Sequence, residues 1–441
     1  MHLLGLNITD LMLSLFMGTM TRNSSDTDSW PWQVLTGSFW ELQGAMVAQS
    51  RPFIPGDIAH PPRNPVLKIN SGYRTEEFSY YFYGLLPALL YGILPNYLWE
   101  NLCKLIRGAR IMLQRKITKE ECDYANQRLI EFVVEFELMY IERKASRIHF
   151  ARPSIHNLIH LGSETVRLGP LGLLSQFTME RMIGSLTSEM RQHSTPYKNL
   201  SERAALRAQV NALLTRMDTV PDTGPPGKKP IDAGGGYFLL YPRDLHTTLL
   251  SEKEVAALKK YNPDTPGTPK AFWVGRLFLP HGQISRSYFQ ESRRSGPVRI
   301  SRMVKILFDG QILYGEVQYF FRYNFSEESQ FEEGPNRKIY HLAMISLCSN
   351  PDPTMLERSH LVIWKCSFQR GEKLLVVPVH AIASVVALLP WPNPSASSND
   401  SNEFLDLFLP DTYYVVEHFG LDFSSLSTPN TSSLFEDNTL E

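Results

Sequence analysis

The chain has 441 residues, of which 43% are hydrophobic and 20% are charged, so it can bury a large core in two or three domains. Its 44 basic and 45 acidic side chains give a formal net charge of -1, an average that gives no reason to expect a nucleic-acid binder. The charge is uneven, however, because residues 374–441 contain Asp and Glu but no Lys or Arg. The positive charge therefore lies upstream of this region.

Four cysteines are widely separated and form no C-x-x-C pair, which argues against a zinc ribbon and favours a reducing compartment. They are Cys103, Cys122, Cys348 and Cys366. Residues 1–20 are apolar but lack a positive n-region, so we do not interpret them as a signal peptide. Residues 78–99 are long enough to span a bilayer, but two prolines break them, and we interpret them as a buried helical hairpin. We expect a nuclear or cytoplasmic protein that is neither secreted nor in a membrane.

The first 217 residues are predicted to be mainly helical. Residues 117–143 carry apolar side chains at i+3 and i+4 spacing, the pattern of an amphipathic helix. Thr118 and Glu121 have the spacing of a capping box at its start. Further helices are predicted over residues 155–164, 176–192 and 200–217.

The chain changes character at residues 218–236, where Pro and Gly indicate a flexible linker and a domain boundary. A β-rich domain is predicted over residues 237–423, with a short helix at 251–261 before the alternating segments begin, and a disordered acidic tail is predicted over 424–441. Asp309-Gly310 between two alternating segments predicts a β-hairpin with a type I′ turn. The fold class is therefore α+β, with a helical region followed by a small β-barrel or sandwich. Strands are predicted at 271–279, 303–308, 311–321, 339–348, 361–368, 373–379, 385–389 and 413–418.

Two basic segments are candidates for binding phosphate groups. In the first, residues 104–119, a solvated face is the favoured interpretation. The second is interleaved with Tyr288 and Phe289, which can stack on bases. For this second segment, nucleic-acid binding stays open beside two alternatives: a solvated face, or an intramolecular partnership with the acidic tail. Its basic residues are Arg286, Arg293, Arg294, Arg299, Arg302 and Lys305.

Two further patterns resemble metal ligands but are weak by themselves. His156 and His160 stand at i and i+4 on a predicted helix, yet the H-E-x-x-H pattern is absent, so packing histidines are favoured. Glu180 lies early in a predicted helix, where the helix dipole stabilises a carboxylate that can bind Mg²⁺. On spacing alone, an exposed helix-capping acid is the favoured interpretation for Glu180.

A series of consecutive motifs runs from His2 to about Leu214. They are MHLLGLNITDL (1–11), PPRNP (61–65), KINSGY (68–73), YGILP (91–95), CKLIR (103–107), FVVEFEL (132–138), LIHL (158–161) with Glu164, RLGP (167–170), SQFTMER (175–181), NLS (199–201) and QVNAL (209–213). Together they resemble the C-terminal half of fungal CACTA (En/Spm-type) transposases, including the uncharacterised domain that follows the catalytic core. YGEVQYFF (314–321), WKC (364–366) and SVVA (384–387) more loosely resemble the β-rich tail of the same proteins.

The resemblance implies part of an RNase H-like core, in which three acidic residues hold two metal ions for phosphoryl transfer. It assigns Glu180 as the third acid, with Mg²⁺ or Mn²⁺ bound only when the site is completed. It also assigns His2 and Arg181 as structural residues of the core. Because the chain begins at Met1, we expect the aspartate of the first motif and the two upstream catalytic aspartates to be missing, so that the chain alone holds no metal.

Together these expectations predict that the chain is a transposon-derived fragment, which is catalytically incomplete and retains DNA or chromatin binding. One alternative is a subunit of an active metal-dependent strand-transfer enzyme, completed by a transposase partner chain that bears the missing aspartates. Another alternative is a protein-interaction module. Neither a membrane nor a small-molecule ligand is expected as a partner.

Overall fold

The computed structural model divides the chain into two compact units. Residues 173–226 form one, here called the small unit, and residues 2–172 together with 227–441 form the other, the large unit. The structure describes residues 2–56, 58, 60–174, 176–190, 194–216, 230–243, 247–263, 265, 269–296, 298–323, 339–396 and 407–419. Most of the predicted linker, residues 218–229, and the predicted tail at 424–441 lie outside these described residues.

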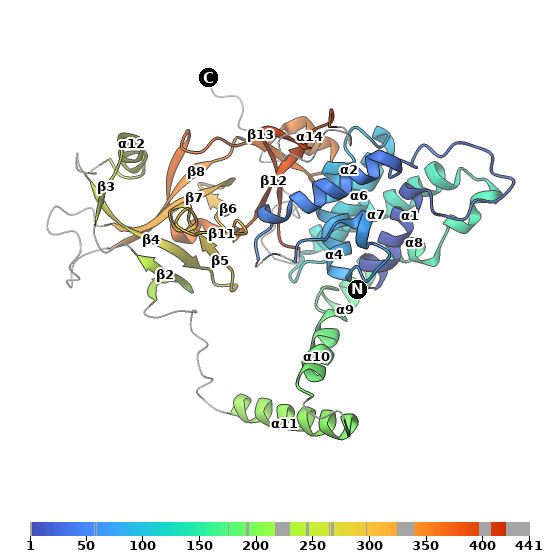
Figure 1. Ribbon diagram of the computed structural model, residues 1–441, viewed down its shortest axis with the longest axis horizontal. Helices are drawn as coiled ribbons and strands as arrows, with labels where there is room; N and C mark the ends of the chain where they lie inside the picture. Colours follow the sequence, from blue (N-terminus) through green and yellow to red (C-terminus); the bar gives the residue numbers. More distant parts are fainter. Residues whose placement is uncertain are drawn as a thin grey trace. The chain divides into compact units, whose positions relative to one another are not determined.

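The first part of the large unit is helical (Figure 1). Its longest helices, α6 and α7, pack so closely at Gly108 that a Cβ there would lie 2.6 Å from Cγ of Leu129. The predicted capping box is confirmed, since Oγ1 of Thr118 accepts from the Glu121 N–H at 3.2 Å and Glu121 accepts from the Thr118 N–H at 2.8 Å. The main elements are η1 (Leu3–Ile8), α1 (Thr9–Met17), α2 (Gly37–Gln49), α4 (Thr75–Tyr80), η3 (Tyr81–Leu85), α5 (Leu86–Leu89), α6 (Asn96–Met112), α7 (Lys119–Phe136), η4 (Glu137–Ile141), α8 (Pro153–Asn157) and α9 (Leu161–Leu168).

The apolar segment at residues 78–99 is part of this helical core. It comprises the end of α4, then η3, α5 and the start of α6, and residues 80–90 are buried throughout. Among the described residues, none of the helices combines the length and the apolar character that crossing a membrane requires. The described elements before β1 are all helical, so this part of the chain shows none of the strands of an RNase H-like sheet.

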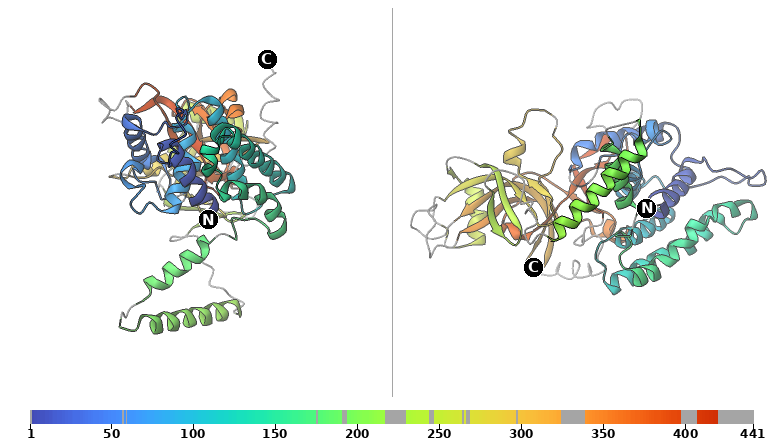
Figure 2. Two further views of the ribbon diagram at one scale, coloured as in Figure 1. Left: turned by 90° about the vertical axis from the view of Figure 1, so that its right-hand side faces the viewer. Right: turned by 90° about the horizontal axis from the view of Figure 1, so that it is seen from below.

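The second part of the large unit is an antiparallel ten-stranded sheet that curls into a half-barrel (Figures 1 and 2). The predicted α+β class is confirmed. Asp309 and Gly310 have φ angles of 50° and 73°, as a type I′ turn between β6 and β7 requires. The strands are β1 (Ile231–Gly234), β2 (Tyr237–Arg243), β3 (Thr248–Leu249), β4 (Lys270–Phe278), β5 (Ile284–Arg286), β6 (Met303–Phe308), β7 (Gln311–Tyr323), β8 (Tyr340–Leu347), β10 (Leu374–Pro378) and β11 (Ile382–Val385).

A second, three-stranded sheet joins the helices to the half-barrel. It has the order β12 (Ala387–Pro392), β13 (Phe408–Val416), β9 (Trp364–Ser367), and Trp391 and Tyr414 belong to the same apolar core as the helical part. The rings of Tyr91 and Trp391 meet edge to face at 5.8 Å. One core therefore joins segments that the sequence analysis assigned to a helical region and to a separate β-rich domain.

In the small unit, α10 (Phe177–Ser188) and α11 (Pro196–Arg216) pair through an ion pair between Glu189 and Arg207. Both helices match predicted ones in position. Apolar side chains on both helices are exposed, among them Met179 on α10 and Leu213 on α11.

A buried ion pair closes the loop that follows α1 onto η5 (Ala145–Phe150). Nε of Arg147 donates to Oδ2 of Asp26 at 2.7 Å, and Asp26 also accepts from Nε1 of Trp30 at 3.0 Å. Both charged side chains are at most 1% exposed. The hydrogen bond from Arg147 holds the pKa of Asp26 well below its usual value, although burial acts in the opposite direction.

We predict that Arg147→Met lowers the free energy of unfolding by about 3–5 kcal/mol at pH 7, because it leaves the Asp26 carboxylate buried without its partner. Since the folded-state pKa of Asp26 is lowered, the stabilisation by the pair is present above about pH 4 and is lost as the pH falls. The difference in free energy of unfolding between the wild type and Arg147→Met, measured by urea denaturation, should therefore be smaller at pH 3 than at pH 7. The control is Asp26→Asn/Arg147→Met, which should recover stability; an equal loss at both pH values would contradict the prediction.

Candidate nucleic-acid interface

The second basic segment of the sequence is held against one end of the half-barrel by a short helix, α13 (Tyr288–Glu291). Ser287 caps this helix by accepting from the Gln290 N–H at 3.3 Å. The N–H and hydroxyl of Ser287 both donate to the carbonyl of Gly275 on β4, at 2.9 and 3.0 Å. The two aromatic side chains Tyr288 and Phe289 are thereby fixed beside the sheet.

Part of the predicted basic patch is neutralised by buried acids. Arg302 donates to Glu291 and to Glu316, at 2.5 Å in each case, and Arg370 donates to Glu316 from the other side. Although burial acts to raise the pKa of Glu316, the hydrogen bonds from Arg370 and Arg302 lower it, so that the carboxylate is charged. Arg302 is therefore a structural residue of this end of the sheet.

Lys305 is also paired inside the protein. Its Nζ lies 3.5 Å from Oε1 of Glu417, which accepts from the Tyr314 hydroxyl at 2.5 Å, and both charged side chains are buried. Burial lowers the pKa of Lys305. The pairing of Lys305 is therefore intramolecular, but Glu417 precedes the predicted acidic tail at 424–441, which lies outside the described residues. Arg299 is half-buried, and its guanidinium lies against Gly56 of the helical part.

The remaining arginines of the segment and one arginine of β4 form a group that we call the cationic cluster: Arg286, Arg293, Arg294 and Arg276. Arg276 on β4 and Arg286 on β5 stand directly opposite each other in the antiparallel register. Burial, and then the positive charges of Arg294 and Arg286, lower the pKa of Arg276. Arg293 and Arg294 are exposed, and the nearest acid to Arg286 is Glu291, at 3.8 Å. Like charges are thus gathered at one edge of the sheet.

A pocket of about 390 Å³, here called the aromatic pocket, adjoins the cationic cluster. The rings of Trp273 and Tyr319 stack in its wall at 4.2 Å, and the Tyr319 hydroxyl donates to Glu254 at 2.9 Å. The guanidinium of Arg293 lies 4.0 Å above the ring of Phe289. The pocket lining includes Lys253, Glu254, Trp273, Tyr288, Phe289, Ser292, Arg293, Gln318 and Tyr319.

Three residues of this region were not predicted from the sequence: Arg276, Trp273 and Glu254. Arg276 and Trp273 lie within the predicted strand 271–279, but strand prediction does not supply the neighbouring strand or its register. Glu254 is the N3 residue of α12 (Glu252–Tyr261), whose capping box with Ser251 is a signal present in the sequence.

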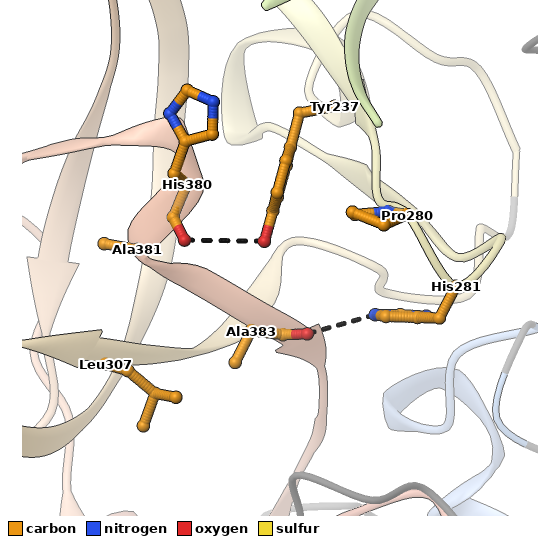
Figure 3. A pocket seen from close by; sticks show the side chains of 7 residues that line it. All are labelled: Tyr237, Pro280, His281, Leu307, His380, Ala381 and Ala383. Atoms are coloured by element: carbon orange, nitrogen blue, oxygen red, sulfur yellow. Dashed lines mark hydrogen bonds between the residues drawn. The ribbon is translucent and has the colours of Figure 1, made fainter. Parts of the chain in front are cut away.

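A second pocket, of about 410 Å³, lies elsewhere on the half-barrel (Figure 3). Nε2 of His281 is 3.0 Å from the carbonyl of Ala383, and the Tyr237 hydroxyl donates to the carbonyl of His380 at 3.4 Å. Burial lowers the pKa of His281, which favours its neutral form. These polar groups are used to join strands, and Pro280 and Leu307 complete an otherwise apolar lining. Its lining contains two histidines but neither Lys nor Arg, whereas Lys253 and Arg293 line the aromatic pocket.

The residues assigned by the transposase resemblance belong to other parts of the chain. Glu180 is exposed in the first turn of α10, in the small unit, and Arg181 follows it on the same helix. His2 is exposed just before η1, in the large unit. His156 and His160 are exposed with their Nε2 atoms 3.0 Å apart. Within the described ranges, His, Cys, Asp and Glu form no group of three that could hold a metal ion.

We predict opposite consequences for two arginines of the same segment. Arg302→Ala should lower the free energy of unfolding by about 3 kcal/mol, because it removes a partner from two buried carboxylates. Arg294→Ala should change it by no more than about 0.5 kcal/mol, because this side chain is exposed. Chemical denaturation of the two variants checks the difference, and equal losses would show that Arg294 is also a structural residue.

Comparison with protein-family models, with curated proteins and with solved structures gives no significant match to the chain. The likeness to CACTA transposases therefore rests on the sequence motifs alone. The candidate interface rests on the geometry of the half-barrel and is independent of that likeness.

Proposed function

We propose that this protein binds nucleic acid through the cationic cluster on its half-barrel. The observation that carries the proposal is the register of β4 and β5, which places Arg276 directly opposite Arg286. Like charges in such a cross-strand pair destabilise a sheet, and here Arg294 adds to the repulsion. A phosphate group between the guanidiniums relieves this repulsion and accepts hydrogen bonds from both.

The proposed binding is local, because the formal net charge of the chain is only -1. Phosphate contacts of this kind position a nucleic acid without reading its sequence. They are strongly weakened by salt, since each neutralised phosphate releases condensed counterions. Tyr288 lies next to the cluster, is half-buried, and provides an aromatic ring for the sugar or base portion of a nucleotide.

We further propose that the chain derives from a CACTA-type transposase and keeps DNA or chromatin binding without strand transfer. The motifs between His2 and about Leu214 support this origin. Under this proposal the protein acts in the nucleus. A metal-dependent enzyme completed by a partner chain, and a protein-interaction module, are the alternative outcomes of the experiments that follow.

We predict that the full chain binds a labelled DNA duplex with an affinity that falls as salt rises, because phosphate binding releases condensed counterions. Arg293→Ala/Arg294→Ala should weaken binding and reduce the slope of log K against log salt by about two, roughly one for each phosphate that is no longer neutralised. Fluorescence anisotropy at several salt concentrations measures both effects.

The matched control is Arg115→Ala/Lys119→Ala, which removes two exposed basic side chains of the first basic segment. It should leave the salt slope unchanged. Equal slopes for wild type and both double variants would contradict the cationic cluster as the binding surface. Failure of the wild type to bind duplex or single-stranded DNA at low salt would favour the protein-interaction module. Mg²⁺-dependent cleavage that requires an added partner chain would favour the enzyme alternative.

A further inference from the structure

We propose that the aromatic pocket takes one unpaired nucleobase of the strand whose phosphates the cationic cluster holds. This inference rests on the proposed function and names its substrate class: single-stranded DNA or RNA, or a duplex with a frayed or overhanging end. Arg293 supplies the physical link, because it belongs to the cluster and also lies 4.0 Å above Phe289 in the pocket wall.

The pocket has the chemistry of a base-stacking site. Aromatic side chains from three elements form it: Trp273 on β4, Tyr319 on β7, and Tyr288 and Phe289 on α13. The rings are held in place by each other, since Trp273 stacks on Tyr319 and meets Phe289 edge to face at 5.2 Å. Tyr319 and Phe289 are buried and support the pocket wall, whereas Trp273 and Tyr288 are half-buried and can reach a bound base. An aromatic ring can stack on any base, because every base has a π-face.

The pocket also offers groups for the polar edge of a base. The Glu254 carboxylate accepts from the Ser251 N–H and hydroxyl through Oε2 and from the Tyr319 hydroxyl through Oε1. A carboxylate has about four acceptor sites, so these three bonds leave it able to accept one more N–H. Gln318 lines the same pocket with an amide oxygen that can accept a further hydrogen bond.

Charge favours a nucleotide over a cationic ligand. A methylated ammonium group is the other ligand that aromatic pockets commonly bind. Here Lys253 and Arg293 outnumber the single carboxylate of Glu254 in the pocket lining, so the net positive charge repels such a cation and attracts the phosphate of a nucleotide.

A paired base exposes only its edge in a groove, so entry into the pocket requires an unpaired base. The preference for single strands therefore separates this inference from duplex binding by phosphates alone.

The experiment compares three labelled oligonucleotides on the full chain by anisotropy: a single-stranded dT 12-mer, a blunt duplex of the same length and the duplex with a three-nucleotide overhang. Ser292→Trp introduces an indole into the pocket lining and leaves all four arginines of the cluster in place. Ser295→Trp places the same side chain on the same loop, outside the pocket lining, and is the matched control.

We expect Ser292→Trp to weaken binding of the single strand and of the overhang by roughly 5- to 100-fold, the loss that follows from removing one base stack. Blunt-duplex binding should match that of Ser295→Trp. In a second pair, Tyr288→Ala should weaken single-strand binding and Tyr288→Phe should restore it, because the phenylalanine ring still stacks.

Equal single-strand affinities of Ser292→Trp and Ser295→Trp would overturn the pocket while leaving duplex binding intact. Binding of a trimethyllysine peptide that Ser292→Trp abolishes, with oligonucleotide binding unchanged, would overturn the nucleobase as its occupant. Absence of binding to any of the three oligonucleotides at low salt would overturn both this inference and the proposed function.

Discussion

The large unit depends on one buried guanidinium, that of Arg110 on α6. It donates to the carbonyl of Tyr83 through Nε and Nη2, and to the carbonyl of Val362 through Nη1 at 2.9 Å. Burial lowers its pKa to about 10, so it is charged at neutral pH. A buried charge must be satisfied by hydrogen bonds, and here the acceptors come from a helical segment and from the loop before β9. The helices and the sheets are therefore constrained to share one core.

Charged side chains elsewhere in the half-barrel are also paired with partners inside the protein. Glu316 holds Arg302 and Arg370, and Glu417 holds Lys305, so several basic residues that look available in the sequence are structural. The cationic cluster differs in that its guanidiniums also lie close to one another, although Arg276 and Arg286 donate to the carbonyls of Tyr241 and Arg299. There the register of two strands brings guanidiniums together, at the edge where the aromatic pocket opens. The proposed interface is therefore located by guanidiniums that lie close to one another, and not by the number of arginines in the segment.

Local features were predictable wherever residues close in the sequence decide them. Thr118 and Glu121 form the expected capping box, and Asp309-Gly310 adopts the positive φ angles of the expected turn. Many predicted strands lie within a few residues of the observed ones. The opposition of Arg276 and Arg286 was not predictable, because it depends on which strands pair and in which register. The pairing of Lys305 with a carboxylate more than a hundred residues away was open for the same reason.

The sequence by itself determined the α+β class, the positions of several helices and of most strands, and the segment in which basic and aromatic side chains alternate. These properties follow from periodicity, capping and turn chemistry, which act over a few residues. Only the tertiary structure decided that the helices and the three-stranded sheet share a core, and which basic side chains of that segment are neutralised by buried acids. Long-range packing and strand register bring distant charges together, and neither is encoded in any short stretch of the chain.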